Sequence, residues 1–376
     1  MHIERLFVRN FRNYEQGDWF LSPGINLFYG ENAQGKTNLL EAVYYCGVGR
    51  SHRTNQEEDL IRWKENQLAV AAQFSREGVS HTLQLTRARQ PRKKEIKLDK
   101  QAIRAKEQLG EMPVVLFSPE DLQLIKGEPA QRRRFLDLEI SQSNHRYYQD
   151  LIRYQRIVLQ RNKLLKAIRE GVASRSELDV WDEPFCEGAA CLLTEREKAV
   201  AHFSHLANEI HLTISGEKEE LRVDYQIADG ENTPFGSDKA DWRLWYERKL
   251  QENRTADIMR GSTSIGPHRD DLLFLLKEGP FKAFASQGQQ RTAVLSLKIA
   301  ELTFVQQAVG FYPVLLLDDV MSELDQRRRD HLLNFISGKI QTFITGTECV
   351  QLHSDSAAAC FLVQNGKLGG GGNGAG

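Results

Sequence analysis

The chain has 376 residues, of which 40% are hydrophobic and 27% are charged, with a formal net charge of −1. This length predicts about two domains of roughly 100 to 200 residues each, and the net charge alone does not indicate an anionic partner. Five scattered cysteines argue against a zinc site and against a secreted disulfide framework. The N-terminus lacks the apolar core of a signal peptide, and no apolar run approaches the roughly 20 residues of a membrane span. We therefore expect a cytoplasmic protein with no membrane partner.

The N-terminal part of the sequence is predicted to be rich in strands. Short, partly alternating apolar runs at residues 3–11, 25–30, 68–74 and 81–88 are separated by Gly, Asn and charged turns. The run INLFY leads directly into GENAQGKTN, which is followed by the apolar-rich LLEAVYYCG. A glycine-rich loop between a buried strand and a helix N-terminus is the setting of a phosphate-binding loop.

This loop is predicted to hold the phosphates of ATP or GTP. Gly30 and Gly35 allow a tight loop whose amides point inward, and the helix N-terminus favours an anion. Lys36 is expected to reach the β- and γ-phosphates and to act in catalysis, while the hydroxyl of Thr37 is expected to hold Mg²⁺. The alternative, a surface turn with a solvated lysine, leaves the full eight-residue pattern unexplained. The predicted nucleotide contacts are Gly30, Glu31, Asn32, Ala33, Gln34, Gly35, Lys36 and Thr37.

Two stretches are locally basic. Residues 87–106 and 132–169 each contain many more Lys and Arg than Asp and Glu. Such a run can contact DNA phosphates without choosing a sequence, or it can be an ordinary solvated face. The sequence leaves both interpretations open for each run.

A helical region follows residue 116. Residues 144–171 carry apolar side chains at about helical spacing, and Gly171 suits a C-terminal stop. A second helical stretch covers residues 181–216. Two antiparallel helices of this length would extend about 40 Å, either as an arm or as a packed helical layer. The apolar face expected for the first helix consists of Leu151, Tyr154, Val158, Leu165 and Ile168.

Apolar strands return after residue 262, at 270–276, 312–319 and 342–347. The nucleotide-binding sheet is therefore predicted to be split in the sequence by a helical insertion. The run YPVLLLDD ends in two carboxylates, of which Asp318 is expected to hold the Mg²⁺ shell and Asp319 to polarise the attacking water. Adjacent acids are also common in turns, so this assignment depends on the phosphate loop.

A second helix N-terminus that can bind an anion is predicted at SQGQQRTAVLSLKIAEL. Ser286 and Gly288 precede a helix with apolar residues, which places a hydroxyl and an amide at a positive helix end. Together with Gln289 they are predicted to contact the nucleotide of another subunit. The alternative is a simple N-cap with no ligand.

These motifs resemble the ATP-binding-cassette superfamily and, within it, the RecF family of recombination mediators, which is related to the heads of SMC proteins. The similarity extends over nearly the whole chain. It implies an α/β fold, an ATP-binding-cassette-like head with a mixed sheet around the phosphate loop, interrupted by a mainly helical insertion. The segments that carry it, in order, are NFRNY (10–14), GENAQGKTN (30–38), FSPEDLQLIKGEPAQRRRFLD (117–137), SIGPHRDDL (264–272), SQGQQR (286–291) and LLLDDVMSELD (315–325).

The resemblance also implies roles and boundaries. Residues 286–290 match the signature of the superfamily, Asp318 its metal-site acid, and residues 322–325 the loop that crosses the dimer interface. We expect ATPase core at residues 1–115 and 282–365, the insertion at 116–281, and a disordered tail at 366–376.

Two departures from the broad superfamily predict slow hydrolysis. Asp319 stands where many cassette ATPases have glutamate, and it reaches the water less easily because it is one methylene shorter. Residues 342–347 contain no histidine, where many members have one that senses the γ-phosphate. The loop glutamine of the superfamily is not located.

The function that the resemblance implies is an ATP-dependent DNA-binding protein of recombinational repair and replication. It would dimerise around ATP and Mg²⁺ at gapped DNA, contact single-stranded and duplex DNA, help to load recombinase or mediator proteins, and show weak DNA-stimulated ATPase activity. A transporter ATPase subunit is an alternative that the long insertion and the basic runs fit poorly. A P-loop phosphotransferase would leave SQGQQR without a role. DNA-stimulated ATP turnover would separate these hypotheses.

Overall fold

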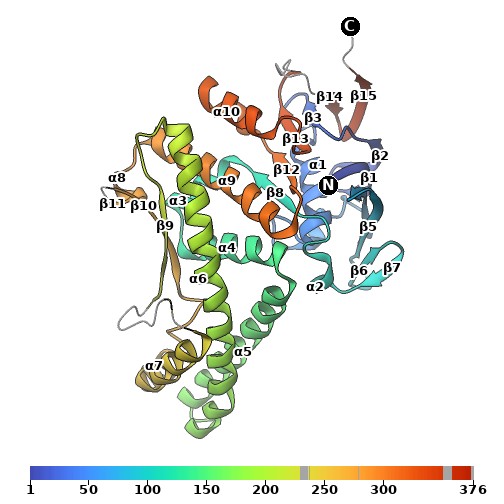
Figure 1. Cartoon of the computed structure of the whole chain (residues 1–376). Helices are drawn as coiled ribbons and strands as arrows, with labels where there is room; N and C mark the ends of the chain where they lie inside the picture. The colour runs from blue at the N-terminus through green and yellow to red at the C-terminus, as the bar shows by residue number, and fades with distance from the viewer. Residues whose placement is uncertain (229–235, 237, 278, 350–357, 374–376) are drawn as a thin grey trace. The chain divides into compact units, whose positions relative to one another are not determined.

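The computed structural model describes residues 1–228, 236, 238–277, 279–349 and 358–373 (Figure 1). The chain divides into two compact units. The first consists of Met1–Asp121 together with Leu297–Gly376, and the second is Leu122–Ser296. The domain bounds expected from the sequence remain a prediction.

The first unit contains an antiparallel six-stranded sheet in the order β2-β1-β4-β5-β6-β7. Alternate apolar side chains of β1 are buried, as the alternating pattern of residues 3–11 predicts. The β4–β5 hairpin turns at Glu77 and Gly78, both with positive φ, which suits a tight two-residue turn. The strands are β1 (His2–Phe11), β2 (Tyr14–Phe20), β4 (Gln67–Arg76), β5 (Val79–Ala88), β6 (Lys93–Leu98) and β7 (Gln101–Ile103).

The second sheet of this unit is mixed, in the order β15-β14-β3-β13-β12-β8. Five strands are parallel, and β15 pairs antiparallel to β14. The run VLLL of β12 is buried at every position, which explains why it reads as continuously apolar. The predicted strands near 25–30, 312–319 and 342–347 are confirmed here. The strands are β3 (Ile25–Tyr29), β8 (Val114–Phe117), β12 (Val314–Leu317), β13 (Thr342–Gly346), β14 (Ala359–Gln364) and β15 (Lys367–Asn373).

Helix α1 (Lys36–Val48) contacts β1 and β4 of the antiparallel sheet and also β8 and β13 of the mixed sheet. It is therefore buried on most of its circumference, which explains its weak amphipathic pattern. It ends at Gly49, whose φ of 80° suits a left-handed cap. Further helices are η1 (Glu57–Leu60), α2 (Ala105–Gln108), η2 (Pro119–Leu122), η4 (Val320–Ser322) and α10 (Gln326–Ile336).

The tail differs from the expectation of disorder over residues 366–376. Lys367–Asn373 form strand β15, which pairs with β14. A glycine-rich run carries no apolar pattern, but its backbone can still complete an antiparallel ladder with a neighbouring strand. Residues 374–376 lie outside the described residues.

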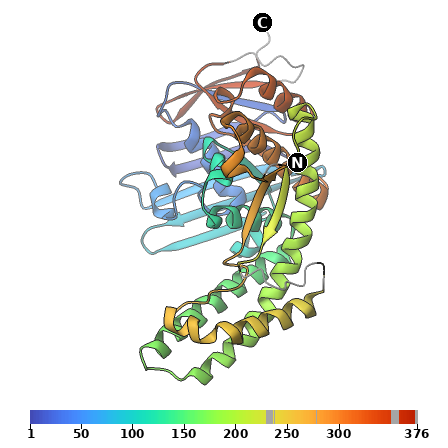
Figure 2. The same cartoon turned by 90° about the vertical axis from the view of Figure 1, so that its left-hand side faces the viewer.

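Three long helices pack together in the second unit, namely α5 (His145–Arg169), α6 (Asp179–Ser215) and α7 (Lys239–Arg260) (Figure 2). The first two confirm the predicted helices, and the five apolar residues expected on α5 are all buried. The side chain of Asn144 caps α5 by accepting from the Tyr147 amide at 3.0 Å. Other helices in this unit are α3 (Gln123–Lys126), α4 (Pro129–Ser143), η3 (Arg175–Leu178), α8 (Phe281–Phe284) and the start of α9 (Gln287–Val309).

A three-stranded sheet, β11-β10-β9, completes this unit. The run at 270–276 forms β10 (Asp271–Leu276) in this sheet and not in the nucleotide-binding sheet, and it lies inside the range predicted for the insertion, 116–281. Its burial alternates along the strand, whereas the central strands of the mixed sheet are buried on both faces. The partner strands are β9 (Arg222–Gln226) and β11 (Gly279–Pro280). Within the described part of the chain, no helix is long and apolar enough to span a bilayer.

Candidate nucleotide-binding site

The phosphate loop connects the end of β3 to the start of α1, as predicted. Gly30 has φ of 145° and Gly35 has φ of 117°, values that side chains rarely allow. A Cβ atom on Gly30 would lie 2.5 Å from the carbonyl oxygen of Val363, and one on Gly35 would lie 2.6 Å from the amide nitrogen of Asn13. Both glycines are therefore required by backbone conformation and by close packing.

Lys36 points into the loop that it follows. Its side-chain nitrogen donates to the carbonyl oxygens of Gly30 and Glu31, the latter at 3.0 Å. Only 6% of the residue is exposed. The ammonium is thus held inside the turn of backbone that the sequence predicts to surround a phosphate chain. Residues 31–34, which form the rest of the predicted contact set, make up the solvent-facing part of this loop.

The predicted metal ligands, Thr37 and Asp318, meet across the unit. The Thr37 hydroxyl donates to Asp318 Oδ1 at 2.9 Å, although 281 positions separate the two residues. Burial raises the pKa of Asp318, while its hydrogen bonds to threonine hydroxyls act in the opposite direction. Hydroxyl and carboxylate oxygens are the ligand type that Mg²⁺ prefers, so these residues fit the predicted metal.

Thr345 connects the two adjacent acids, and the sequence did not identify it. Its hydroxyl donates to Asp318 Oδ1 at 2.9 Å and accepts from the Asp319 amide at 2.8 Å. Thr345 lies on β13, next to β12 in the sheet. In the sequence, this strand drew attention only because its end lacks the histidine that many members of the superfamily have there.

Asp319 differs from its neighbour in both exposure and backbone. It is exposed, whereas Asp318 is buried. Its φ of 59° lies in the left-handed region, which costs energy for a residue other than glycine. This conformation turns the carboxylate-bearing residue away from the core at the end of β12. The Asp319 carboxylate is therefore accessible to solvent, whereas that of Asp318 is not.

Residues of NFRNY support the phosphate loop from behind. The Asn13 amide donates to the carbonyl of Gln34 at 2.9 Å, and the Tyr14 hydroxyl donates to the carbonyl of Gly35 at 3.0 Å. On the other side, the Asn365 amide donates to Gln34 Oε1 at 2.7 Å. The loop is thus held by the first hairpin and by the β14–β15 turn. The resemblance marked NFRNY as a motif without giving it this role.

Arg12 of the same motif belongs to a partly buried ion-pair cluster beside α1. It forms a two-pronged contact with Glu41, with both distances 2.8 Å, and Arg53 also contacts this carboxylate at 3.4 Å. Ser51 donates to it at 2.5 Å. Burial alone would raise the pKa of Glu41, but the hydrogen bonds from Arg12 and Ser51 lower it. This cluster fixes α1 against the segment that follows it.

The signature residues lie in the second unit, at the start of α9. The Ser286 hydroxyl accepts from the Gln289 amide at 3.3 Å, and the Gln289 side chain accepts from the Ser286 amide at 2.7 Å. This reciprocal pair is a capping box, which satisfies two free amides at the helix end. Gln289 also donates to Glu219 at 2.9 Å. Ser286, Gly288 and Gln289 are thus brought together by the helix itself.

The basic run at 87–106 is partly neutralised within the antiparallel sheet region. Arg92 pairs with Glu58 at 2.6 Å, and Lys94 pairs with Glu57 at 2.7 Å. The side chains of Arg92 and Lys93 are 72% and 69% exposed, whereas that of Lys94 is only 20% exposed. Arg92 and Lys93 are therefore accessible to a partner, whereas Lys94 is largely covered and also donates to the carbonyl oxygen of Gly49.

The basic run at 132–169 includes arginines that cannot belong to a solvated face. Arg132 is buried in a two-pronged pair with Asp271, at 2.7 and 2.8 Å. Arg161 is fully buried between Asp182 and Asp257, at 2.9 and 3.1 Å. For these two residues the expected phosphate-contacting role is replaced by an internal one, because each already has carboxylate partners away from water.

A buried polar network surrounds the segment SIGPHRDDL. At its centre, Arg196 of α6 pairs with Asp137 at 2.7 Å and contacts the hydroxyls of Tyr147 and Tyr225 at 3.0 and 2.9 Å. It also donates to the carbonyl of Pro267 at 2.6 Å. Its side chain is 2% exposed. One guanidinium thus joins two helices, a strand and the loop before β10.

Two titratable residues of this segment have strongly shifted pKa values. Burial lowers the pKa of His268 to about 3, and its ring nitrogen lies 2.8 Å from the Tyr154 hydroxyl. Burial raises the pKa of Asp270 to about 6, although the Tyr225 hydroxyl and the Ala228 amide donate to it at 2.7 and 3.1 Å. Both residues are used by internal contacts, so they form part of the scaffold.

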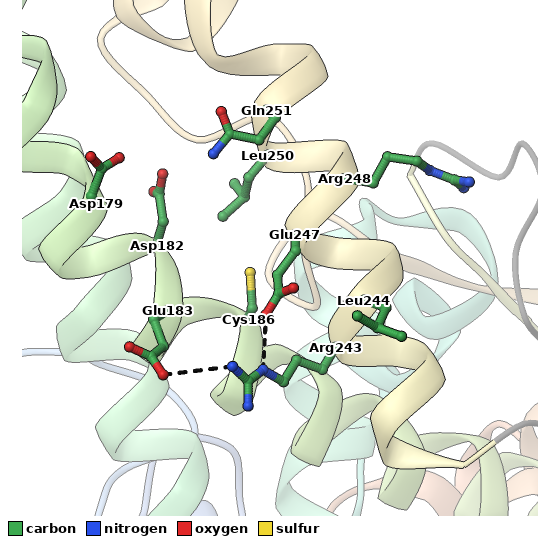
Figure 3. A pocket seen from close by; sticks show the side chains of 10 residues that line it. All are labelled: Asp179, Asp182, Glu183, Cys186, Arg243, Leu244, Glu247, Arg248, Leu250 and Gln251. Carbon is green, nitrogen blue, oxygen red and sulfur yellow. Dashed lines mark hydrogen bonds and ion pairs between the residues drawn. The ribbon is translucent and has the colours of Figure 1, made fainter.

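A shallow pocket lies between α6 and α7 (Figure 3). Two of its acidic side chains contact Arg243, Glu247 at 2.9 Å and Glu183 at 3.6 Å. Four carboxylates and two arginines line it, and none of the predicted site residues does. We do not assign it a ligand.

The fold and the site together define an ATPase head of the RecF and SMC type. A family model described as RecF/RecN/SMC N terminal domain matches residues 2–367. The head domain of Smc bound to the C-winged helix domain of ScpA is 15% identical with a TM-score of 0.55, covering 98% of this chain and 96% of that one. At this identity the likeness shows the fold alone.

More similar relatives narrow the class. The DNA replication and repair protein RecF of Listeria monocytogenes serotype 4b (strain CLIP80459) is 40% identical over 371 residues, covering 98% of this chain and 99% of the relative. RecF of Clostridium botulinum (strain ATCC 19397 / Type A) is 41% identical over 374 residues with the same coverage. A structure of the recombination mediator protein RecF with ATP, from the RecFOR pathway, matches with 33% identity and a TM-score of 0.91, covering 98% and 97% of the two chains. The chain belongs to the RecF family of DNA replication and repair proteins.

Proposed function

We propose that this chain binds ATP with Mg²⁺ at the phosphate loop and uses it as a switch in recombinational DNA repair and replication. The contact between Thr37 and Asp318 carries the proposal, because it joins the two predicted metal ligands next to a lysine-containing loop. The family relative solved with ATP supports the choice of nucleotide.

The roles follow from what each side chain offers. Lys36 supplies positive charge to the β- and γ-phosphates, and the amides of residues 30–37 surround the phosphate chain. Thr37 and Asp318 hold Mg²⁺, which neutralises phosphate charge when bound. Asp319 orients and polarises the attacking water, and Thr345 holds the backbone of Asp319 beside Asp318.

Weak, DNA-stimulated hydrolysis is part of the proposal. An aspartate reaches the water less easily than a glutamate, so the ATP-bound state is expected to last. Replacing Asp319 with asparagine keeps the shape but removes the charge, so ATP should still bind while turnover falls about 100-fold or more. The readout is phosphate release with and without DNA. Turnover equal to that of the wild type would show that Asp319 is not the group that acts on water.

Dimerisation is proposed to complete the site. Ser286, Gly288 and Gln289 of one copy would contact the γ-phosphate held by Gly30–Thr37 of the other, and residues 322–325 would lie at the interface. The start of α9 offers a helix N-terminus for this purpose. ATP would then join two copies and ADP would not, since the contact requires the third phosphate.

The proposed setting is gapped DNA. The dimer would contact single-stranded and duplex DNA through phosphate contacts, and it would help to load recombinase or mediator proteins. The relatives carry the names of a DNA replication and repair protein and of a recombination mediator in the RecFOR pathway, which supports this setting.

The decisive test is analytical ultracentrifugation with ATP and with ADP. The wild type should dimerise only with ATP. Ser286→Arg should remain monomeric although each copy still binds ATP, because bulk and charge enter the interface. Ser286→Ala is the comparison variant: it removes the helix cap, which costs about 1 kcal/mol of stability, together with the proposed hydroxyl contact, but it adds neither bulk nor charge, so it should weaken ATP-dependent dimerisation less than Ser286→Arg does. Dimerisation of Ser286→Arg at the wild-type level would refute the shared site.

A further inference from the structure

Two cysteines that are 11 positions apart in the sequence, Cys349 and Cys360, come into contact beside β3, the strand that precedes the phosphate loop. The Sγ atoms of Cys349 and Cys360 are 2.6 Å apart, a separation only slightly longer than the roughly 2.0 Å of an S–S bond. Both thiols are free. Cys349 is exposed and Cys360 is partly exposed, so small reagents from solution can reach the pair.

The other three cysteines occupy different surroundings. Cys46 and Cys186 are buried, and burial raises the pKa of each thiol to about 12. Cys191 is partly exposed and donates weakly to Asp150 at 3.5 Å. Buried thiols at high pKa are inert, because the thiolate is the form that reacts. Reactivity is therefore expected at Cys349 and Cys360 rather than in the interior.

The contact joins the segments on either side of β3. The sheet order β14-β3-β13 places the phosphate-loop strand between them. Cys349 follows the end of β13, and Cys360 lies on β14 opposite Leu27 of β3. The same β14 approaches the phosphate loop, because the Val363 carbonyl lies against Gly30. A covalent link between these cysteines would therefore connect the segments flanking the strand that carries the loop.

We propose that Cys349 and Cys360 form a redox modification site, at which a small-molecule disulfide such as glutathione disulfide oxidises them to an intramolecular disulfide. The thiolate of Cys349 attacks one sulfur of glutathione disulfide and releases one glutathione thiolate. The thiolate of Cys360 then attacks the Cys349 sulfur and releases the second. Both protein thiols lose their protons, the protein is oxidised by two electrons, and one glutathione disulfide is reduced to two glutathione thiols.

The order of the two steps follows from the surroundings. Burial and the neighbouring Cys349 raise the pKa of Cys360 to about 11, so this thiol is the slower initial nucleophile. Cys349 is the more exposed of the two and meets the reagent first. Once the mixed disulfide has formed, Cys360 is already in contact with the sulfur that it must attack, which gives the second step a high effective concentration.

The test uses the full-length protein, without nucleotide or DNA, so that its outcome does not depend on the proposed function. The protein is treated with glutathione disulfide, blocked with iodoacetamide under denaturing conditions, and digested with trypsin. Both cysteines lie in one tryptic peptide, residues 340–367, because no Lys or Arg occurs between residues 340 and 366. The expected peptide has lost both alkylation sites and is two hydrogens lighter than its fully reduced form.

Variants separate the proposal from unspecific oxidation. Cys360→Ser should stop at a glutathione adduct on Cys349, and Cys349→Ser should react more slowly than the wild type. Cys191→Ser is the matched control and should form the internal disulfide as the wild type does. Dithiothreitol should restore both alkylation sites. Full alkylation of both cysteines in the treated wild type, a stable glutathione adduct, or a disulfide-linked dimer on a non-reducing gel would each overturn the proposal.

Discussion

Two polar regions of this molecule, the phosphate-loop site and the network around SIGPHRDDL, contain similar residue types but differ in where their polar groups are directed. At the first, Asp319 is exposed and Asp318 meets two hydroxyls next to an open loop. In the second, Arg196 and Asp270 are buried and have several internal partners. The proposed ligand site therefore keeps an exposed carboxylate and a solvent-facing loop beside its buried groups, whereas the buried groups of the second region have internal partners and stabilise the fold.

The two buried aspartates make the same point. Burial raises the pKa of both Asp318 and Asp270. Asp318 accepts a hydrogen bond from the Thr37 hydroxyl, which is itself a possible metal ligand. Asp270 accepts hydrogen bonds from a tyrosine hydroxyl and a backbone amide inside the second unit. A shifted pKa alone does not distinguish a catalytic carboxylate from a structural one.

The largest effect is expected when Arg196, at the centre of the network around SIGPHRDDL, is replaced. Arg196→Met removes the cation from a buried pair and leaves Asp137 without its main partner, so the free energy of unfolding should fall by about 3 to 5 kcal/mol. Lys198→Met, at an exposed position of the same helix, is the control and should change stability by less than about 1 kcal/mol. Urea denaturation measures both. A loss as small as that of the control would show that the network is not a scaffold.

At the phosphate loop, a substitution is expected to reduce ligand binding and to leave the stability of the fold nearly unchanged. Lys36→Met should weaken ATP binding by about 100-fold or more, roughly 3 kcal/mol, because a charge-assisted contact to phosphate is lost. The melting temperature should change little. Binding is measured by titration with a fluorescent ATP analogue, and Lys64→Met, on an exposed turn, is the control. A variant that keeps wild-type affinity would remove Lys36 from the site.

Asp270 should give the second unit a pH-dependent stability. Because its pKa is near 6 when folded and near its usual value when unfolded, the folded state binds the proton more tightly. This contribution is fully present below about pH 4 and is lost as the pH rises to about 6, up to about 3 kcal/mol. Asp270→Asn should flatten this part of the pH profile of unfolding, whereas Asp224→Asn on the surface should not. An unchanged slope would contradict the assignment.

The smallest expected effect concerns DNA. Replacing Arg92 and Lys93 with glutamine should weaken DNA binding and reduce its salt dependence by about one unit of slope per lost phosphate contact. Lys94→Gln should leave the slope unchanged, since only 20% of the Lys94 side chain is exposed, against 72% for Arg92 and 69% for Lys93. Fluorescence anisotropy over a range of salt concentrations measures this. Equal slopes for the wild type and the double variant would assign this run to a solvated face.

The sequence by itself determined the features that depend on local pattern. Glycines at positions 30 and 35 require a loop, the apolar spacing of residues 144–171 requires a helix, and the run at 314–317 requires a buried strand. Each signal arises from residues a few positions apart, so it survives without knowledge of the rest of the chain.

Only the tertiary structure decided which distant groups meet. It placed Thr345 between Asp318 and Asp319, directed Arg132 and Arg161 inward, paired β10 with β9, and brought Cys349 to Cys360. A basic or polar residue has the same local pattern whether it faces solvent or a buried partner. The difference depends on contacts between residues far apart in the chain, and periodicity carries no information about them.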